Sequence, residues 1–250
     1  MRIIVNGQQA FGKACLEAML DRGDDVVAVY CAPDKEGKPV DPIKEFALEK
    51  GLNLIQPPNY TDAEVLDEMR ALNADLMVMA FMIIFVPEEA RDIPTNGSIC
   101  FHPSLLPKHR GPSSINWPIM AGATKTGLSI FWPDDGMDEG DILLQKEIDI
   151  GPDDTLGTVD FEKVFPLGVE VVLEAVDLVT AVEPPPDARG RRPRATTSPR
   201  EAMVAEARIM RRREPHATRA GPDRSTSRPT MSAPPAAPAP PAPATTLVTT

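Results

Sequence analysis

Short apolar runs recur along the first hundred residues of this 250-residue chain, and segments of helical periodicity lie between them. The runs predict buried strands over residues 2–6, 25–30, 53–55, 76–79 and 97–101. The intervening segments predict helices over residues 13–20, 42–49 and 61–72, the last with a Thr61 cap and Glu64 at the capping-box position. Strands that are apolar on both faces and alternate with helices predict an α/β fold with a Rossmann-like, mostly parallel sheet and helices on both faces.

The following segment departs from this simple alternation. A short helix is expected over residues 113–120, and residues 126–132 and 141–150 have the alternating pattern of strands. The loop between these strands, PDDGMDEG, is acidic and rich in turn residues. A closing helix is expected within residues 154–182, where VEVVLEAVDLV is apolar at helical spacing. Residues 1–182 therefore predict one folded domain.

The composition changes sharply after residue 182. Residues 183–250 contain 12 Arg but no Lys, 14 of the chain's 28 Pro, and no Phe, Trp or Tyr. A segment so poor in apolar and aromatic side chains cannot bury a core, so it is predicted to be a disordered tail. The abrupt switch to Arg alone fits a shifted reading frame in a GC-rich gene, and a natural disordered tail is the alternative.

Charge excludes one class of partner. Residues 1–182 hold 14 Lys and Arg against 31 Asp and Glu. A body this acidic repels phosphate backbones, and its sequence shows no basic cluster to offset the repulsion, so a nucleic-acid partner is not expected.

Three features predict a soluble cytoplasmic protein. Cys15, Cys31 and Cys100 are odd in number and widely spaced, as in proteins of a reducing compartment. The first residues lack the apolar region and cleavage site of a signal peptide. The longest apolar run, Leu76 to Val86, has 11 residues, which is about half of what a membrane span needs.

His102 directly follows the predicted strand 97–101, and Pro103 is expected to end that strand. Ligands of open parallel sheets bind outside the carboxyl ends of the strands, so His102 is a candidate functional residue. A carboxylate on the neighbouring acidic loop could orient its imidazole for acid/base work. By spacing alone, a solvated turn is the favoured interpretation of the aspartates Asp134, Asp135, Asp138 and Asp141. DDGMDEGD lacks the spacing of a calcium loop, and no metal is expected.

Two other motifs are absent. NGQQAFG follows the first strand but is not the GxGxxG pattern of dinucleotide-binding proteins, so no nicotinamide cofactor is expected. Gly7 and Gly12 instead indicate a tight strand-to-helix turn. The chain also lacks the GxSxG elbow of the α/β hydrolases.

Two long motifs carry a resemblance to a known family. HPSLLPKHRG with SSINWPI, followed by SIFWPDDGMDEGDILLQKE, resembles the folate-dependent formyltransferases. The likeness is greatest to the N-terminal hydrolase domains of 10-formyltetrahydrofolate dehydrogenases, and methionyl-tRNA formyltransferases are also similar. It begins at Arg2 and runs through Val182, so residues 1–182 are expected to be a formyltransferase catalytic domain. The barrel-like domain that follows in such relatives is missing here, and residues 183–250 stand in its place.

The resemblance implies a pair of catalytic residues. It puts His102 at the position of the family's catalytic histidine and Asp138 at that of its catalytic aspartate. In such a mechanism Asp138 orients or deprotonates the attacking group, and His102 stabilises charge on the formyl oxygen. The substrate would be 10-formyltetrahydrofolate, as formyl donor.

One position departs from the transferase pattern. Glycinamide ribonucleotide and methionyl-tRNA formyltransferases carry an Asn two residues before this histidine, and here the residue is Cys100. A thiol is a weaker hydrogen-bond donor than an amide. The dehydrogenase branch also has an apolar residue there, which favours that branch. Cys100 as a nucleophile and Cys100 as a small buried residue are the other interpretations.

The resemblance also implies folate contacts. The pterin is expected against Phe81, Met82 and Phe85 on one side and against Pro133, Asp134 and Asp135 on the other. The FMIIF segment supplies the apolar wall that a flat heterocycle needs, although some of its residues could simply belong to the core. His109 and Arg110 are candidate contacts for a phosphate or a glutamate tail.

The predicted function is formyl transfer or hydrolysis that releases tetrahydrofolate, with water or an amine as acceptor. Methionyl-tRNA formyltransferase is the alternative among enzymes. An inactive folate-binding remnant of a truncated gene is the alternative outside that class.

Overall fold

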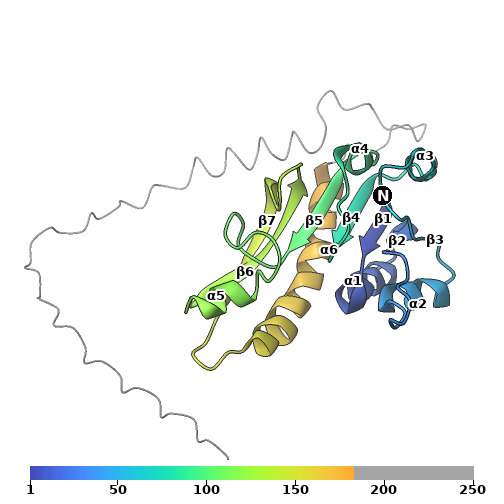
Figure 1. Ribbon diagram of the computed structural model, residues 1–250. Coiled ribbons are helices and arrows are strands. Elements are labelled where there is room, and N and C mark those ends of the chain that lie inside the picture. The colour runs from blue at the N-terminus through green and yellow to red at the C-terminus, as the bar shows by residue number, and fades with distance from the viewer. Residues whose placement is uncertain (183–250) are drawn as a thin grey trace, which may run out of the picture. The chain divides into compact units, whose positions relative to one another are not determined.

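The computed structural model describes residues 1–182. The predictions for residues 183–250, the disordered tail and the missing barrel, lie outside the described residues. Seven strands form one sheet in the order β3-β2-β1-β4-β5-β6-β7 (Figure 1). They are β1 (Arg2–Gly7), β2 (Asp25–Tyr30), β3 (Leu54–Ile55), β4 (Leu76–Ala80), β5 (Ser98–His102), β6 (Lys125–Pro133) and β7 (Gly140–Asp149).

The pairing confirms the predicted mostly parallel sheet. Strands β1 to β5 pair in parallel, whereas β6 runs antiparallel to both β5 and β7. Parallel strands need a crossover between them, which the helices provide, while β6 and β7 are joined by a short loop. That loop is the acidic segment 134–139.

Helices cover both faces of the sheet (Figure 1). The larger core joins one face to α1 (Gln9–Asp21), α2 (Pro42–Glu49) and α6 (Phe165–Val182), and includes Val5, Val78, Ile43 and Val176. The smaller core joins the other face to α3 (Ala63–Ala71) and α4 (Glu88–Arg91), and includes Ile4, Met77, Leu66 and Ala90. The remaining elements are α5 (Asn116–Met120) and the π-helical segment η1 (Thr158–Val164) that precedes α6.

Two helix starts differ from the sequence-based prediction. The residue at the N-cap position of α3 is Asp62, not Thr61, and its side chain makes no capping hydrogen bond, while the Thr61 hydroxyl donates to Asn59 Oδ1 (2.9 Å). The α1 helix begins at Gln9, four residues earlier than predicted, and the Gln9 amide donates to Asp41 Oδ1 (2.7 Å). Neither contact could be read from local periodicity, because the partner residue lies outside the helix.

Gly7 and Gly12 form the tight turn that the sequence predicted. A Cβ at Gly7 would lie 2.6 Å from the Ala80 carbonyl oxygen, and one at Gly12 would lie 3.1 Å from the Gly7 backbone. The turn therefore needs two residues without side chains, and it brings α1 close to the ends of β1 and β4.

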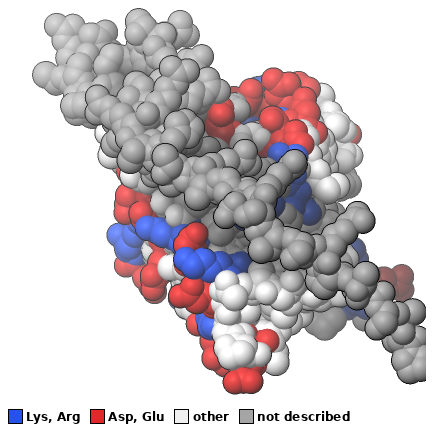
Figure 2. Space-filling view, turned by 90° about the vertical axis from the view of Figure 1, so that its left-hand side faces the viewer, with Lys and Arg blue, Asp and Glu red and all other residues white. Residues whose placement is uncertain are grey.

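Charged side chains of both signs lie on the surface (Figure 2), and the helices are too short or too polar to span a membrane within residues 1–182. In the part of the surface that Figure 2 shows uncovered, acidic side chains lie among the Lys and Arg side chains. Within residues 1–182, none of the helices has the length and apolar character needed to cross a lipid bilayer.

Candidate active site

His102 is the last residue of β5, and it still pairs with Ser129 of β6. The predicted range 97–101 is thus shifted by one residue, because β6 extends the ladder to His102, and the strand ends directly before Pro103 as expected. Side chains alternate along a strand, so His102 and Cys100 point to the same face of the sheet. His102 is buried, at 6% exposure. A polar side chain this buried needs partners for both ring nitrogens.

Both ring nitrogens of His102 have an oxygen partner. Nδ1 lies 3.4 Å from Asp138 Oδ2, and Nε2 lies 2.9 Å from the carbonyl oxygen of His109. Each oxygen accepts hydrogen bonds, so an imidazole that carries protons on both nitrogens satisfies both contacts. The structure thus brings together His102 and Asp138, which stand 36 residues apart in the sequence.

Asp138 is held in place by the backbone around it. It has a φ angle of +49°, which few residues other than glycine adopt. Its Oδ2 accepts a hydrogen bond of 2.6 Å from the Gly111 amide, in the segment that follows β5. The carboxylate therefore contacts both the imidazole and the segment that carries His109.

The rest of the acidic loop is an ordered turn. Asp134 Oδ1 accepts from the Gly136 amide (2.9 Å), and the Asp134 amide donates to the Glu139 carbonyl (3.1 Å). Asp135 forms an ion pair with Arg91 (2.8 Å). The aspartates of this loop thus have different contacts, and Asp138 is the one that contacts His102.

The anion-contact candidates also lie beside this pair. His109 has a φ angle of +53° and offers its carbonyl to His102. The Arg110 guanidinium forms an ion pair with Glu139. Their role toward a phosphate or a glutamate tail stays a prediction; of the two, His109 contacts His102 through its carbonyl, and Arg110 contacts Glu139, the neighbour of Asp138.

Cys100 is present as a thiol. Burial, together with the nearby charge of Asp138, raises its pKa to about 12. At neutral pH the sulfur therefore keeps its proton, which disfavours the nucleophile interpretation because the thiolate is the reactive form. A thiol at this position can act only as a weak hydrogen-bond donor.

Alkylation should report this state. Cys15 and Cys31 are buried, while Cys100 is partly accessible, so iodoacetamide should label Cys100 first in the folded protein. Because thiolate is the reacting form and the pKa is raised, labelling should be slow at pH 8 and rise about tenfold per pH unit through pH 10 without levelling off. Mass spectrometry of the labelled peptide gives the rate. A plateau below pH 9 would show that the Cys100 pKa is near its ordinary value.

The segment that follows β4 forms a partly exposed apolar surface. Phe81, Ile83 and Phe85 are exposed, whereas Met82 and Ile84 pack against the smaller core. Both interpretations of FMIIF thus apply, each to different residues. The placement of Phe81 and Phe85 leaves their side chains accessible to a ligand.

An apolar pocket of about 200 Å³ lies at the carboxyl ends of β1, β4 and β5. It is lined by Gln9, Ala10, Phe11, Phe81, Phe101, Pro103, Ile115, Asp160, Phe161, Val164 and Phe165. Asp160 is the one ionisable side chain in this lining, and burial raises its pKa. The lining includes neither His102 nor Asp138, and Phe101 belongs to the larger core, on the face of the sheet opposite to Cys100 and His102.

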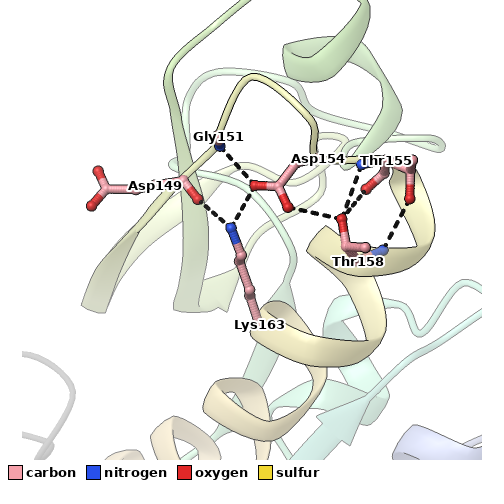
Figure 3. A network of polar contacts seen from close by, with 6 residues as sticks. All are labelled: Asp149, Gly151, Asp154, Thr155, Thr158 and Lys163. Atoms are coloured by element: carbon pink, nitrogen blue, oxygen red, sulfur yellow. Dashed lines mark hydrogen bonds and ion pairs between the residues drawn. The ribbon is translucent and has the colours of Figure 1, made fainter.

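A polar network holds the segment that closes this pocket (Figure 3). The carboxylate of Asp154 contacts Lys163 Nζ, the Gly151 amide (2.7 Å) and the Thr158 hydroxyl (2.8 Å), and these contacts lower its pKa to about 2. Lys163 also donates to the Asp149 carbonyl at the end of β7 (3.0 Å). The network ties η1, which carries Asp160 and Phe161, to the sheet.

Sequence reasoning missed two features of this region. Arg91 is buried and paired with the acidic loop, but its sequence context, PEEARD, resembles an ordinary charged helix. The pocket combines side chains from α1 to α6, and no local pattern relates them. Groups of three or more His, Cys, Asp or Glu side chains able to hold a metal are not found among residues 1–182.

Comparison with known proteins identifies relatives over the described region. The sequence profile of the formyl transferase family matches residues 1–176. Cytosolic 10-formyltetrahydrofolate dehydrogenase of Xenopus tropicalis is 44% identical over 184 residues, which are 72% of this chain and 20% of the relative. Methionyl-tRNA formyltransferase of Alkaliphilus oremlandii (strain OhILAs) is 35% identical over 184 residues, which are 72% of this chain and 59% of that protein. The chain spans about a fifth of the length of the dehydrogenases it matches.

A solved structure supports the fold. Phosphoribosylglycinamide formyltransferase from Bacillus halodurans superimposes with a TM-score of 0.63, covering 73% of this chain and 97% of that protein, at 21% identity. An identity this low relates the two folds and nothing finer. The predicted family resemblance and the predicted fold class are both confirmed.

Proposed function

Because the chain belongs to the formyl transferase family, we propose that residues 1–182 form a catalytic domain that removes the formyl group from 10-formyltetrahydrofolate and releases tetrahydrofolate. The observation that carries this proposal is the contact between His102 Nδ1 and Asp138 Oδ2 at the carboxyl end of β5. This edge of an open sheet is where ligands bind, and the pair combines a donor and a base there.

The proposed reaction follows from these two side chains. Water or an amine attacks the formyl carbon, and the formyl oxygen becomes an oxyanion. Asp138 accepts the proton of the attacking group, and the imidazole of His102 stabilises the charge that develops on the formyl oxygen. The bond to N10 then breaks, N10 takes a proton, and tetrahydrofolate leaves. The other product is formate when water attacks and a formamide when an amine attacks.

We propose that the folate lies between two segments that follow strands. Phe81, Met82 and Phe85 form one wall, and Pro133, Asp134 and Asp135 form the other. The exposure of Phe81 and Phe85 supports the first wall, and the ordered turn at residues 134–139 supports the second. No cofactor other than the folate substrate enters this proposal.

The acceptor is proposed to be water or a small apolar amine. The neutral thiol of Cys100 gives an oxyanion less support than an amide would, which is consistent with a hydrolase. The apolar pocket at the carboxyl ends of β1, β4 and β5 is lined by five phenylalanines, one carboxylate and no Lys or Arg, so a phosphate would meet no compensating positive charge there. We place the reaction in the cytoplasm, which the three free cysteines support.

Methionyl-tRNA formyltransferase is the second candidate, since a relative of that name is 35% identical to this chain. The acidic composition of residues 1–182 weighs against a nucleic-acid substrate. A folate-binding remnant without activity is the third candidate, because the chain spans a small part of its dehydrogenase relatives.

One experiment separates these candidates. Full-length protein is incubated with 10-formyltetrahydrofolate alone, with an amine acceptor, or with initiator methionyl-tRNA, and tetrahydrofolate release is followed. Release without an acceptor supports the hydrolase, and release that requires an amine or the tRNA supports a transferase. Folate binding without release in all three arms would contradict the proposed activity.

Replacing Phe81 tests the folate wall. Phe81→Ala is expected to weaken folate binding by about tenfold, because an aromatic wall lost from a heterocycle site is worth on the order of 1 to 3 kcal/mol. Leu48→Ala is the matched control, since Leu48 is also exposed but lies on α2. Titration calorimetry gives both affinities. An unchanged folate affinity and melting temperature in Phe81→Ala would place this side chain outside the site.

A further inference from the structure

We propose that Arg91 is a positioning residue that clamps together the two walls of the folate site, an inference that rests on the proposed function. Arg91 Nη1 donates to the Val86 carbonyl (3.0 Å), and Nη2 donates to Asp135 Oδ1 (2.8 Å). Val86 belongs to the segment after β4, and Asp135 belongs to the acidic loop between β6 and β7. A single guanidinium therefore bridges segments that stand about fifty residues apart in the sequence.

One partner of the clamp is buried and the other is exposed. The Arg91 side chain is 5% exposed, and the Ser98 hydroxyl at the start of β5 donates to the Arg91 carbonyl (2.6 Å). The preceding residue, Ala90, is part of the smaller core. Asp135, in contrast, has a side chain that is 70% exposed. The exposed acidic loop is thus attached to Arg91, a buried residue of α4 whose backbone is bonded to β5.

Stability alone gives little reason for this arrangement. Arg91 Nε is buried and has no hydrogen-bond partner within residues 1–182. Burying a guanidinium costs desolvation energy, and an ion pair with a largely exposed carboxylate returns little of it. What the two hydrogen bonds provide is a fixed spacing between the loops, because the guanidinium is planar and its donors have a set geometry.

The clamp is separate from the catalytic pair. Asp138 is held by the Gly111 amide and by His102, and neither contact involves Arg91. Loss of the clamp should therefore loosen the folate walls while leaving the acid/base geometry in place. A positioning role of this kind predicts a larger effect on KM for the folate than on kcat.

Kinetics of three variants test the clamp. Arg91→Met and Asp135→Ala are each expected to raise KM for 10-formyltetrahydrofolate about tenfold, with kcat within about threefold of wild type. Arg91→Lys keeps the charge but loses the planar pair of donors, so it should recover only part of the affinity. Asp135→Ala removes the acceptor of an exposed side chain and leaves the core intact, which keeps the test valid if Arg91→Met folds poorly. An unchanged KM in Asp135→Ala overturns the proposal.

A double variant and a matched control sharpen the result. If the two residues act through one contact, Arg91→Met with Asp135→Ala should be no worse than either single variant. Effects that multiply would show that Asp135 binds the folate directly, which overturns the clamp. Glu89→Gln is the control, because it removes a carboxylate from the same helix and breaks the exposed ion pair with Arg70, so KM should not change.

Amide hydrogen exchange on the folate-free protein separates this inference from the proposed function. In Arg91→Met and Asp135→Ala, residues 81–87 and 133–139 should exchange about tenfold faster than in wild type, with the rest of the sheet unchanged. Wild-type rates in both segments would overturn the clamp whatever the protein binds. A wild-type protein that neither binds nor turns over the folate would refute the proposed function. The exchange rates of the folate-free variants would still show whether Arg91 holds the two segments together.

Discussion

Alanine at His102 or at Asp138 is expected to lower turnover of 10-formyltetrahydrofolate by about 100-fold or more, while folate still binds. The two side chains meet at 3.4 Å and would act on one tetrahedral intermediate, so removal of either disables the same step. The double variant should then be little worse than either single variant. Turnover and melting temperature are measured on all three proteins. Asp138→Asn is added because it keeps an oxygen that can accept from the Gly111 amide.

The control for this prediction is Asp153→Asn, which removes an exposed carboxylate from the turn after β7 and should leave turnover unchanged. A purely structural pair would behave differently. Its loss would lower the melting temperature first, and activity would fall only with the folded fraction. Turnover within about threefold of wild type in folded Asp138→Ala protein would contradict the mechanism.

The second large effect is expected at Gly140, the first residue of β7. Its φ angle is +122°, which residues with a side chain rarely adopt, and a Cβ there would lie 1.9 Å from the Trp132 carbonyl oxygen. Gly140→Ala must therefore separate β6 from β7 at the base of the acidic loop. The melting temperature should fall by about 10 °C or more, since loss of several kcal/mol shifts a domain of this size by that amount. Turnover should fall as Asp138 is displaced.

Gly122→Ala separates the clash from the backbone strain. Gly122 also has a positive φ angle, +66°, but a Cβ there meets nothing within 4 Å. Its replacement should cost only the conformational strain, which is about 1 kcal/mol. Thermal unfolding curves, recorded by circular dichroism, give the melting temperatures of the two variants. Equal losses of melting temperature would show that the contact with Trp132 is not the cause.

Local sequence signals predicted the sheet well and its details less well. The buried strands were predicted to within about two residues because runs such as Leu76–Ala80 are apolar on both faces, which is a local property. Thr61 was assigned as a cap because of its spacing from Glu64, but its hydroxyl donates to Asn59 instead. His102 was placed after the strand because of Pro103, whereas pairing with Ser129 of β6 keeps it in the sheet. In both cases a hydrogen-bond partner, which the spacing of apolar and capping residues does not reveal, decides where the element begins or ends.

Local residue patterns were enough to assign the family and the fold class, because long motifs and strand periodicity involve neighbouring residues. The family resemblance also nominated His102 and Asp138 as a pair, but their contact, the pairing of Asp135 with Arg91 and the set of phenylalanines in the pocket are seen in the folded structure alone. These contacts join segments that are 36 to about 150 residues apart. Their geometry depends on how β4, β5, β6 and α6 pack, and no local spacing encodes that packing.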